Sequence, residues 1–206
     1  MVMARATTTQ GARTNRSGVN CLQRRIDGIR PVTTDDIDGK LAQGWGGESP
    51  NGIHVNVLLA RRGSPTAAAI IAAFTSPTPG FTPVLASLGK DQASYVTLNP
   101  PTVILNKSKP DTAFQENVIF GAAPVGIAQG VLDAVAEGLL TPDQETIVLV
   151  SLWVDPAVAD ETEACRNART ATRKAVQEAV KGRSKQERQV LVAQREDITH
   201  PFYGGR

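Results

Sequence analysis

Histidine is the side chain best suited to move a proton near neutral pH, and His54 is one of two in this sequence. Residues 53–65 show alternating apolar and polar positions and then an apolar stretch, which predicts a buried strand, a tight turn and the start of a helix. On a strand, His54 and Asn56 share one face, while Val55 and Val57 point to the other. The sequence therefore fixes a titratable group on one rigid face. A histidine with a purely structural role is the alternative interpretation.

The turn after this strand holds the next residues with chemical potential. Ser64 follows a glycine, but no GxSxG motif surrounds it, and helix capping accounts for it. Pro65 then suits the first helical position, where its missing N–H is no loss. Arg61 and Arg62 would suit an anionic ligand, and ending a strand in charge is an equally ordinary explanation.

Strands and helices alternate along the rest of the chain, which predicts a two-layer α/β domain with a single sheet. The expected order is strand, helix, strand, strand, helix, strand, helix. After the first strand these are a helix at 66–75, an apolar segment at 81–88, a strand at 102–105, a helix from 111 or 112 toward 120, a small-residue turn at 121–126, a helix that ends near Gly138, a strand at 146–154 and a helix at 161–182. Residues 183–196 favour a further short strand or helix. The glycines between 121 and 130 form no phosphate-binding motif and are predicted to serve turns and close packing.

Two stretches before the first strand lack a periodic apolar pattern. Residues 37–52 contain five glycines and Trp45, which predicts a loop at the entrance to the strand. Residues 1–36 contain many arginines and favour a basic, disordered extension over an RNA-binding arm. The expected organisation is this extension followed by one domain at 37–206.

The 206-residue chain carries a formal net charge of +2 and no basic stripe interleaved with aromatic residues, so nucleic acid is not an expected partner. Cys21 and Cys165 lie far apart and fit no metal spacing, which favours two thiols in a reducing cytoplasm and no metal site. Polar residues or glycines interrupt each apolar run, so we expect no membrane span. The start of the chain lacks the apolar core of a secretory signal, and we expect a cytoplasmic protein.

Several segments, in this order and spacing, resemble the formaldehyde-activating enzyme family. They are His54 to Pro65, Gly80-Phe81-Thr82, Asn106-Lys107, Phe120-Gly121, Asp133 to Gly138, and Gln194-Arg195 through Thr199-His200-Pro201-Phe202. The resemblance runs from about residue 37 to residue 202. It implies an α/β two-layer sandwich with one mixed sheet and helices packed on one face.

The resemblance also implies an activity. Enzymes of this family condense formaldehyde with tetrahydromethanopterin, a reduced pterin that acts as co-substrate, and give the methylene derivative and water. His54 falls where the family has its general acid, and a histidine contributes roughly 10²- to 10⁴-fold in such a role. The implied pterin-contacting positions are Asn56, Leu85, Lys107, Lys109 and Pro124. The resemblance implies a homo-oligomeric ring, such as a pentamer, with sites between subunits.

Three of these positions depart from the family pattern. Asn56 stands where the family has an aspartate, Lys109 where it has a threonine, and Pro124 where it has a glutamine. Proline offers neither a side-chain amide nor a backbone N–H, so that contact to the pterin cannot be made in the same way. The alternative hypothesis is therefore a paralogue that binds a reduced pterin or a one-carbon adduct without turnover, as a carrier or sensor. A third hypothesis is an interaction protein that recruits a partner or nucleic acid through its basic extension.

Overall fold

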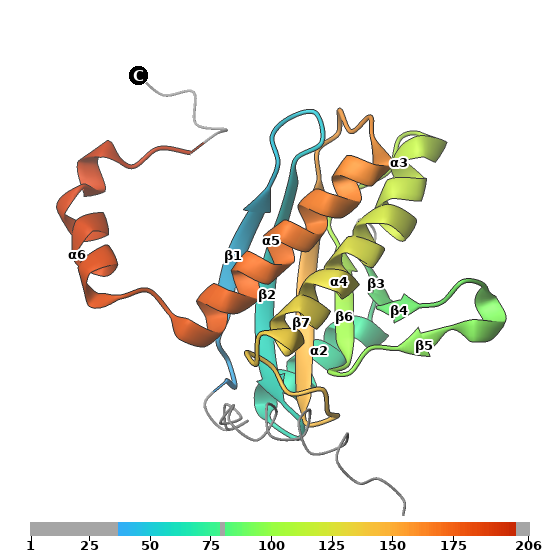
Figure 1. Ribbon diagram of the computed structural model, residues 1–206, viewed down its shortest axis with the longest axis horizontal. Helices are drawn as coiled ribbons and strands as arrows, with labels where there is room; N and C mark the ends of the chain where they lie inside the picture. The colour runs from blue at the N-terminus through green and yellow to red at the C-terminus, as the bar shows by residue number, and fades with distance from the viewer. Residues whose placement is uncertain (1–36, 79–80, 201–206) are drawn as a thin grey trace, which may run out of the picture. The chain divides into compact units, whose positions relative to one another are not determined.

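The computed structural model describes residues 37–78 and 81–200, and a mixed sheet of five strands is its central element (Figure 1). In spatial order the strands are β1 (Leu41–Gly46), β2 (Ile53–Arg61), β7 (Thr146–Val154), β6 (Thr102–Asn106) and β3 (Thr82–Leu85). β6 and β7 are parallel, and the other neighbours are antiparallel. The predicted α/β class with one mixed sheet and packed helices is confirmed.

A parallel pair requires a crossover connection, and one long helical segment supplies it between β6 and β7. The segment consists of α3 (Ala113–Asn117), the π-helical η3 (Val118–Ala122) and α4 (Ala123–Ala136). Together with α5 (Glu161–Lys181), α4 packs on one face of the sheet. Val55, Val57 and Leu59 of β2 point into this core and are almost fully buried, as the alternation predicts.

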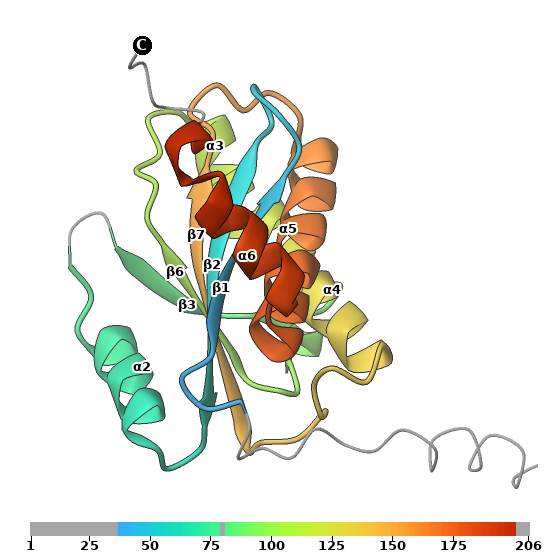
Figure 2. The same ribbon diagram turned by 90° about the vertical axis from the view of Figure 1, so that its left-hand side faces the viewer.

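A smaller helix, α2 (Pro65–Thr75), packs on the opposite face of the sheet (Figure 2). The Ser64 hydroxyl caps it by accepting a hydrogen bond from the backbone N–H of Ala67, and Pro65 is its first residue, as predicted. Ala67 and Ile70 of this helix are buried against Ala60 and its neighbours on the sheet. The helices therefore do not all lie on one face. Because α2 is short, it covers only one end of its face.

Several small elements complete the described chain. β4 (Ser87–Leu88) and β5 (Val96–Thr97) form a small two-stranded antiparallel sheet in addition to the predicted mixed sheet, with the 3₁₀ turn η2 (Gln92–Ser94) between them. After α5 come α6 (Lys185–Ala193) and the 3₁₀ turn η4 (Arg195–Asp197). The short strand or helix predicted at 183–196 is therefore a helix. The predicted extension at 1–36 lies outside the described residues.

The loop predicted at 37–52 was wrong, because it contains strand β1. Its glycines are needed for packing against α5: a Cβ on Gly44 would lie 2.0 Å from the carbonyl oxygen of Ala171, and one on Gly46 would lie 2.0 Å from that of Asn167. Glycine in a strand marks close approach of another backbone as well as a turn. The glycine content that favoured a loop is therefore what allows the helix to lie directly on the strand.

The turn predicted at 121–126 was also wrong, because the helix runs through it. A Cβ on Gly126 would lie 2.1 Å from the carbonyl oxygen of Cys165, so this glycine allows the two helices to pack closely. The predicted role of these glycines in close packing is therefore confirmed for Gly126. The continuous helix Ala113–Ala136 has 24 residues and is long and apolar enough to cross a membrane by length and composition. Half of its most apolar window is buried inside the fold, which is the packing of a core helix.

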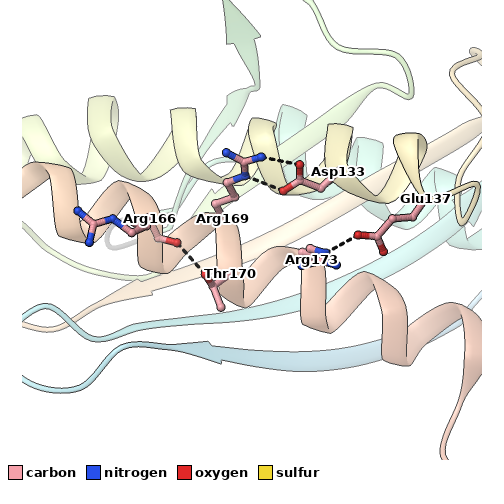
Figure 3. A network of polar contacts seen from close by, with 6 residues as sticks. All are labelled: Asp133, Glu137, Arg166, Arg169, Thr170 and Arg173. Atoms are coloured by element: carbon pink, nitrogen blue, oxygen red, sulfur yellow. Dashed lines mark hydrogen bonds and ion pairs between the residues drawn. The ribbon is translucent and has the colours of Figure 1, made fainter.

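Two ion pairs join α4 and α5 on their outer side (Figure 3). Arg169 donates two hydrogen bonds to the Asp133 carboxylate, at 2.6 and 2.7 Å, and Arg173 donates one to Glu137. The Arg169 guanidinium lowers the pKa of Asp133, chiefly through these hydrogen bonds. These charged residues lie one helical turn apart on each helix, so both pairs form in the same packing of the two helices.

Candidate active site

His54 lies between two tryptophans on the open part of the sheet, away from α4 and α5. Trp45 is its register partner on β1, and Trp153 is its register partner on β7. The ring centroids of Trp45 and His54 are 5.3 Å apart, and those of the two indoles are 5.6 Å apart in a stacked arrangement. Strand pairing thus gathers three rings at one end of the sheet: two from the neighbouring strands β1 and β2, and one from β7, which is distant in sequence.

These rings line a cavity of about 500 Å³. Its lining consists of aromatic, polar and basic side chains: Gln43, Trp45, His54, Lys107, Trp153, Thr199 and His200. Among these residues there is no carboxylate. The site therefore offers flat apolar surfaces together with groups that carry or share protons, which is a common composition of small-molecule sites.

A hydrogen bond to Gln43 fixes the tautomer of His54. The Nε2 atom of His54 lies 2.7 Å from Oε1 of Gln43. An amide oxygen only accepts, so Nε2 carries the hydrogen and donates it. In the neutral ring Nδ1 is then the nitrogen without a hydrogen. Proton uptake and release by His54 consequently take place at Nδ1.

The cavity disfavours positive charge on its basic residues. Burial lowers the pKa of His54, and the charges of Lys107 and His200 lower it further. Burial also lowers the pKa of Lys107. Removal from water penalises the charged form of a base, and like charges add to that penalty. His54 is therefore mainly neutral at pH 7, and its protonated form is a stronger acid than a free imidazolium.

Lys107 reaches the cavity because the chain is held firmly just after β6. The Asn106 side chain closes a local turn: its amide donates to the carbonyl of Ser108 at 2.6 Å and accepts from the Ser108 N–H at 2.9 Å. The Lys107 N–H donates to the carbonyl of Leu152, and Ser108 Oγ accepts from the N–H of Val154. These bonds to β7 place the Lys107 side chain beside Trp153.

Two of the other predicted positions, Asn56 and Lys109, lie near this cavity without lining it, whereas the strand register places Leu85 farther along the sheet, level with Val103 and Leu149. Asn56 is exposed on the same face of β2, opposite Gln43 on β1. Lys109 lines a smaller neighbouring cavity of about 200 Å³, which shares Lys107 and Trp153 with the first. Leu85 is exposed at the end of edge strand β3, beside β6.

Pro124 is not brought to His54 within this chain. It lies at the start of α4, and α4 packs on the sheet face opposite to His54. Its neighbours Ala122 and Val125 line a larger, open hollow of about 820 Å³ between the start of α4 and the start of α5. That hollow contains Glu116, Glu161 and Cys165 but no histidine or lysine, and burial raises the pKa of the Cys165 thiol. The cavity at His54 is thus the better candidate for acid–base chemistry.

No group of three or more histidine, cysteine or acidic side chains in the described ranges 37–78 and 81–200 is arranged to hold a metal ion. Three cavity residues were not predicted as site residues: Gln43, Trp45, which was assigned to a loop, and Trp153. Thr199 and His200 were named only within a resembling segment. Gln43 and Trp45 could have been found from the alternation of Leu41, Gln43 and Trp45 with small residues that include glycines. Such glycines are typical of a strand that packs closely against another backbone.

Comparison with known proteins gives a consistent result. The family model of the formaldehyde-activating enzyme matches residues 44–203. A protein of Methanosarcina barkeri named 5,6,7,8-tetrahydromethanopterin hydro-lyase is 28% identical over 158 residues, which cover 76% of this chain and 85% of that protein. Two proteins named bifunctional enzyme Fae/Hps are also similar, from Methanothrix thermoacetophila (27% over 162 residues) and Archaeoglobus fulgidus (28% over 160 residues). The matches cover 78% and 77% of this chain but only 40% and 39% of those two proteins. Because the family model covers most of the sequence, the chain belongs to the formaldehyde-activating enzyme family.

Proposed function

We propose that this protein condenses formaldehyde with tetrahydromethanopterin, or a related reduced pterin, to the methylene derivative and water, with His54 as general acid. The observation that carries the proposal is the cavity that joins His54, Lys107 and two indoles in a chain of this family. The relative from Methanosarcina barkeri carries the name 5,6,7,8-tetrahydromethanopterin hydro-lyase, which supports a reduced pterin and the release of water. The protein would act as a carbon–nitrogen lyase without a metal.

His54 has a defined task in this chemistry. An amine of the pterin adds to formaldehyde and gives a carbinolamine, whose hydroxyl leaves as water only when a proton reaches its oxygen. The Gln43 hydrogen bond holds Nε2–H and leaves Nδ1 to deliver that proton. The lowered pKa of His54 makes its protonated form a stronger donor, although a smaller fraction of the protein carries the proton at pH 7.

The remaining cavity residues suit the binding of a flat, polar ring. Trp45 and Trp153 present aromatic faces, and Lys107 presents an amine that donates hydrogen bonds. Pro124 lies on the other side of the sheet from His54, so it would border the pterin only at a site completed by a second subunit. We therefore include a homo-oligomer, in which neighbouring subunits share each site, in the proposed function.

A non-catalytic paralogue that binds a reduced pterin or one-carbon adduct is the second candidate. Two observations favour it: Asn56 leaves the face of β2 beside His54 without a carboxylate, and Pro124 supplies no side-chain hydrogen bond. A carboxylate near His54 would raise the pKa of the imidazole and keep more of it protonated at neutral pH. With asparagine at position 56, that support for an acid is absent.

A stopped-flow assay separates the two candidates. Full-length protein is mixed with formaldehyde and tetrahydromethanopterin, and methylene-pterin formation is measured above the uncatalysed rate. The proposed enzyme accelerates it, and His54→Gln removes about 10²-fold or more of the acceleration. Asn56→Asp should raise kcat at neutral pH, because it restores a carboxylate beside the acid. Saturable pterin binding by calorimetry without acceleration in the wild type or in Asn56→Asp would select the carrier.

A further inference from the structure

The last described segment of the chain returns to the cavity of His54. Helix α5 ends at Gly182, which has a φ of 67° and turns the chain away from the α4–α5 layer. Residues 183–200, here named the C-terminal arm, then form α6 and η4. A reciprocal capping box of Ser184 and Glu187 starts α6, and no residue of α6 is buried (Figure 1). The arm thus has a defined start and helix but contributes nothing to the core.

The end of the arm, unlike α6, meets the sheet. Thr199 and His200 line the same 500 Å³ cavity as His54 and Lys107. We propose that His200 is a second acid–base residue of this cavity, which accepts the proton released when the methylene bridge closes. This inference rests on the proposed function, and it deepens it by assigning the second proton transfer.

The proposed reaction needs a base as well as an acid. The first pterin amine adds to formaldehyde, and its N–H hydrogen ends on the new hydroxyl group. His54 donates a proton to that hydroxyl, the C–O bond breaks, and water leaves an iminium ion. The second amine forms the new C–N bond and must lose its N–H proton, which His200 takes. The net change is one water released and one proton moved from His54 to His200, and exchange with solvent restores both rings.

A pair of imidazoles in one cavity suits these opposite roles. The charge of His200 lowers the pKa of His54, so a proton on one ring disfavours a proton on the other. A proton that His200 takes up after His54 has released its own therefore meets no charged imidazole in the cavity. Among the described residues, Lys107 is the other charged group that lines this cavity, and its smaller neighbour adds Lys109, Asp111 and Asp155; the charged residues of η4 in the arm are Arg195, Glu196 and Asp197.

Kinetics of the full chain test the assignment. With His200→Gln we expect kcat to fall about 10²-fold, with little change in KM for the pterin, because glutamine keeps a polar group and loses the base. The wild-type pH profile of kcat should be a bell. His200→Gln should remove its fall at low pH, and His54→Gln its fall at high pH. Glu196→Gln is the matched control, since it removes a titratable group from the arm outside the cavity and should leave kcat unchanged.

Imidazole NMR supplies a readout that needs no turnover. The chain has two histidines, so His54→Gln leaves one imidazole signal and assigns both. In His200→Gln the pKa of His54 should rise, and in Glu196→Gln it should not. A wild type that accelerates the reaction while His200→Gln keeps full kcat would overturn the inference and leave the proposed function standing. If His200→Gln did not change the pKa of His54, the placement of both imidazoles in one cavity would be contradicted. An inactive wild type would overturn the proposed function and this acid–base assignment with it.

Discussion

The two faces of the central sheet differ in what they do, although the same strands build both. On the face toward α4 and α5, Val55 and Val57 are buried to 1% exposure or less, in a core closed by glycines and alanines. On the other face α2 covers only one end, and the far end keeps His54 and two indoles around a cavity. Consecutive residues of β2 thus belong to different environments, one dry and close-packed, the other partly open.

This difference explains how a site can vary within a stable fold. The packed face fixes the position and register of β2, because α5 lies directly on its neighbour β1 through Gly44 and Gly46. The open face then receives residues at fixed positions without having to supply the core. A substitution such as asparagine at position 56 changes the chemistry there at little expected cost in stability.

Neighbouring substitutions on β2 test the comparison most strongly. His54→Gln should lower kcat by about 10²- to 10⁴-fold with the free energy of unfolding nearly unchanged. Val55→Ala should lower the free energy of unfolding by about 2 kcal/mol, because it removes two buried methyl groups and leaves a cavity, and should keep kcat per folded molecule. Stopped-flow kinetics and urea unfolding measure the two quantities. If both variants lost activity and stability together, the two faces would not be independent.

A pair of glycines on one helix gives the next largest effect. A Cβ on Gly126 meets the carbonyl oxygen of Cys165 at 2.1 Å, whereas a Cβ on Gly121 meets no atom within 4 Å. Gly126→Ala should therefore destabilise the protein by about 3 kcal/mol, since the backbone of α5 must move. Gly121→Ala should be neutral or stabilising by up to about 1 kcal/mol, because alanine favours helix. Equal thermal melting of the two variants would contradict the close packing of α4 and α5.

The pH dependence of stability sharpens the comparison on the open face. His54 has a lowered pKa in the folded protein, so the unfolded chain binds more protons between that pKa and the ordinary value of 6.5. The free energy of unfolding should therefore rise with pH across this window and fall as the pH drops below 6.5. His54→Gln should flatten this part of the curve, measured by urea unfolding at several pH values. A curve that keeps its slope in the variant would assign the effect to other groups.

The ion pairs of the packed side should have the smallest effect. Arg169 lowers the pKa of Asp133, so the pair stabilises the fold above the ordinary carboxylate pKa of 3.8 and loses this contribution as the pH falls through the lowered pKa. The pair is in contact with solvent, with 48% of the Arg169 side chain and 24% of the Asp133 side chain exposed, and is screened by salt, so Asp133→Asn should change the melting temperature only slightly at pH 7 and less still at high salt. A large, salt-independent loss would mean that this contact is part of the core.

Local patterns predicted the elements whose signals are local. The alternation at 53–61, the Ser64 cap and the alanine face of α5 all appear in the structure as expected. The segment at 37–52 was misassigned as a loop, because its glycines make room for a neighbouring backbone, and at 121–126 the predicted close packing is present but the predicted turn is not. That distinction depends on which helix lies above the residue, which the sequence does not state.

The candidate site could be predicted only in part. His54, Lys107 and the face of Asn56 follow from strand alternation and from the family resemblance. Trp45 and Trp153 join His54 through the strand order β1-β2-β7, and His200 through the path of the arm, neither of which periodicity determines. The segments that carry Trp153 and His200 lie about 100 residues or more from His54, and contacts over that separation require the fold itself.

The two tryptophans of the cavity are also the two tryptophans of the whole chain. Intrinsic fluorescence excited at the indole band therefore originates entirely from the walls of the site. A flat ligand that enters between them should quench this emission, and the stacked indoles, with centroids 5.6 Å apart, should give a coupled circular dichroism signal that disappears when β1 separates from β2 and β7. The native protein thus carries an unlabelled optical reporter of occupancy at one place in its structure.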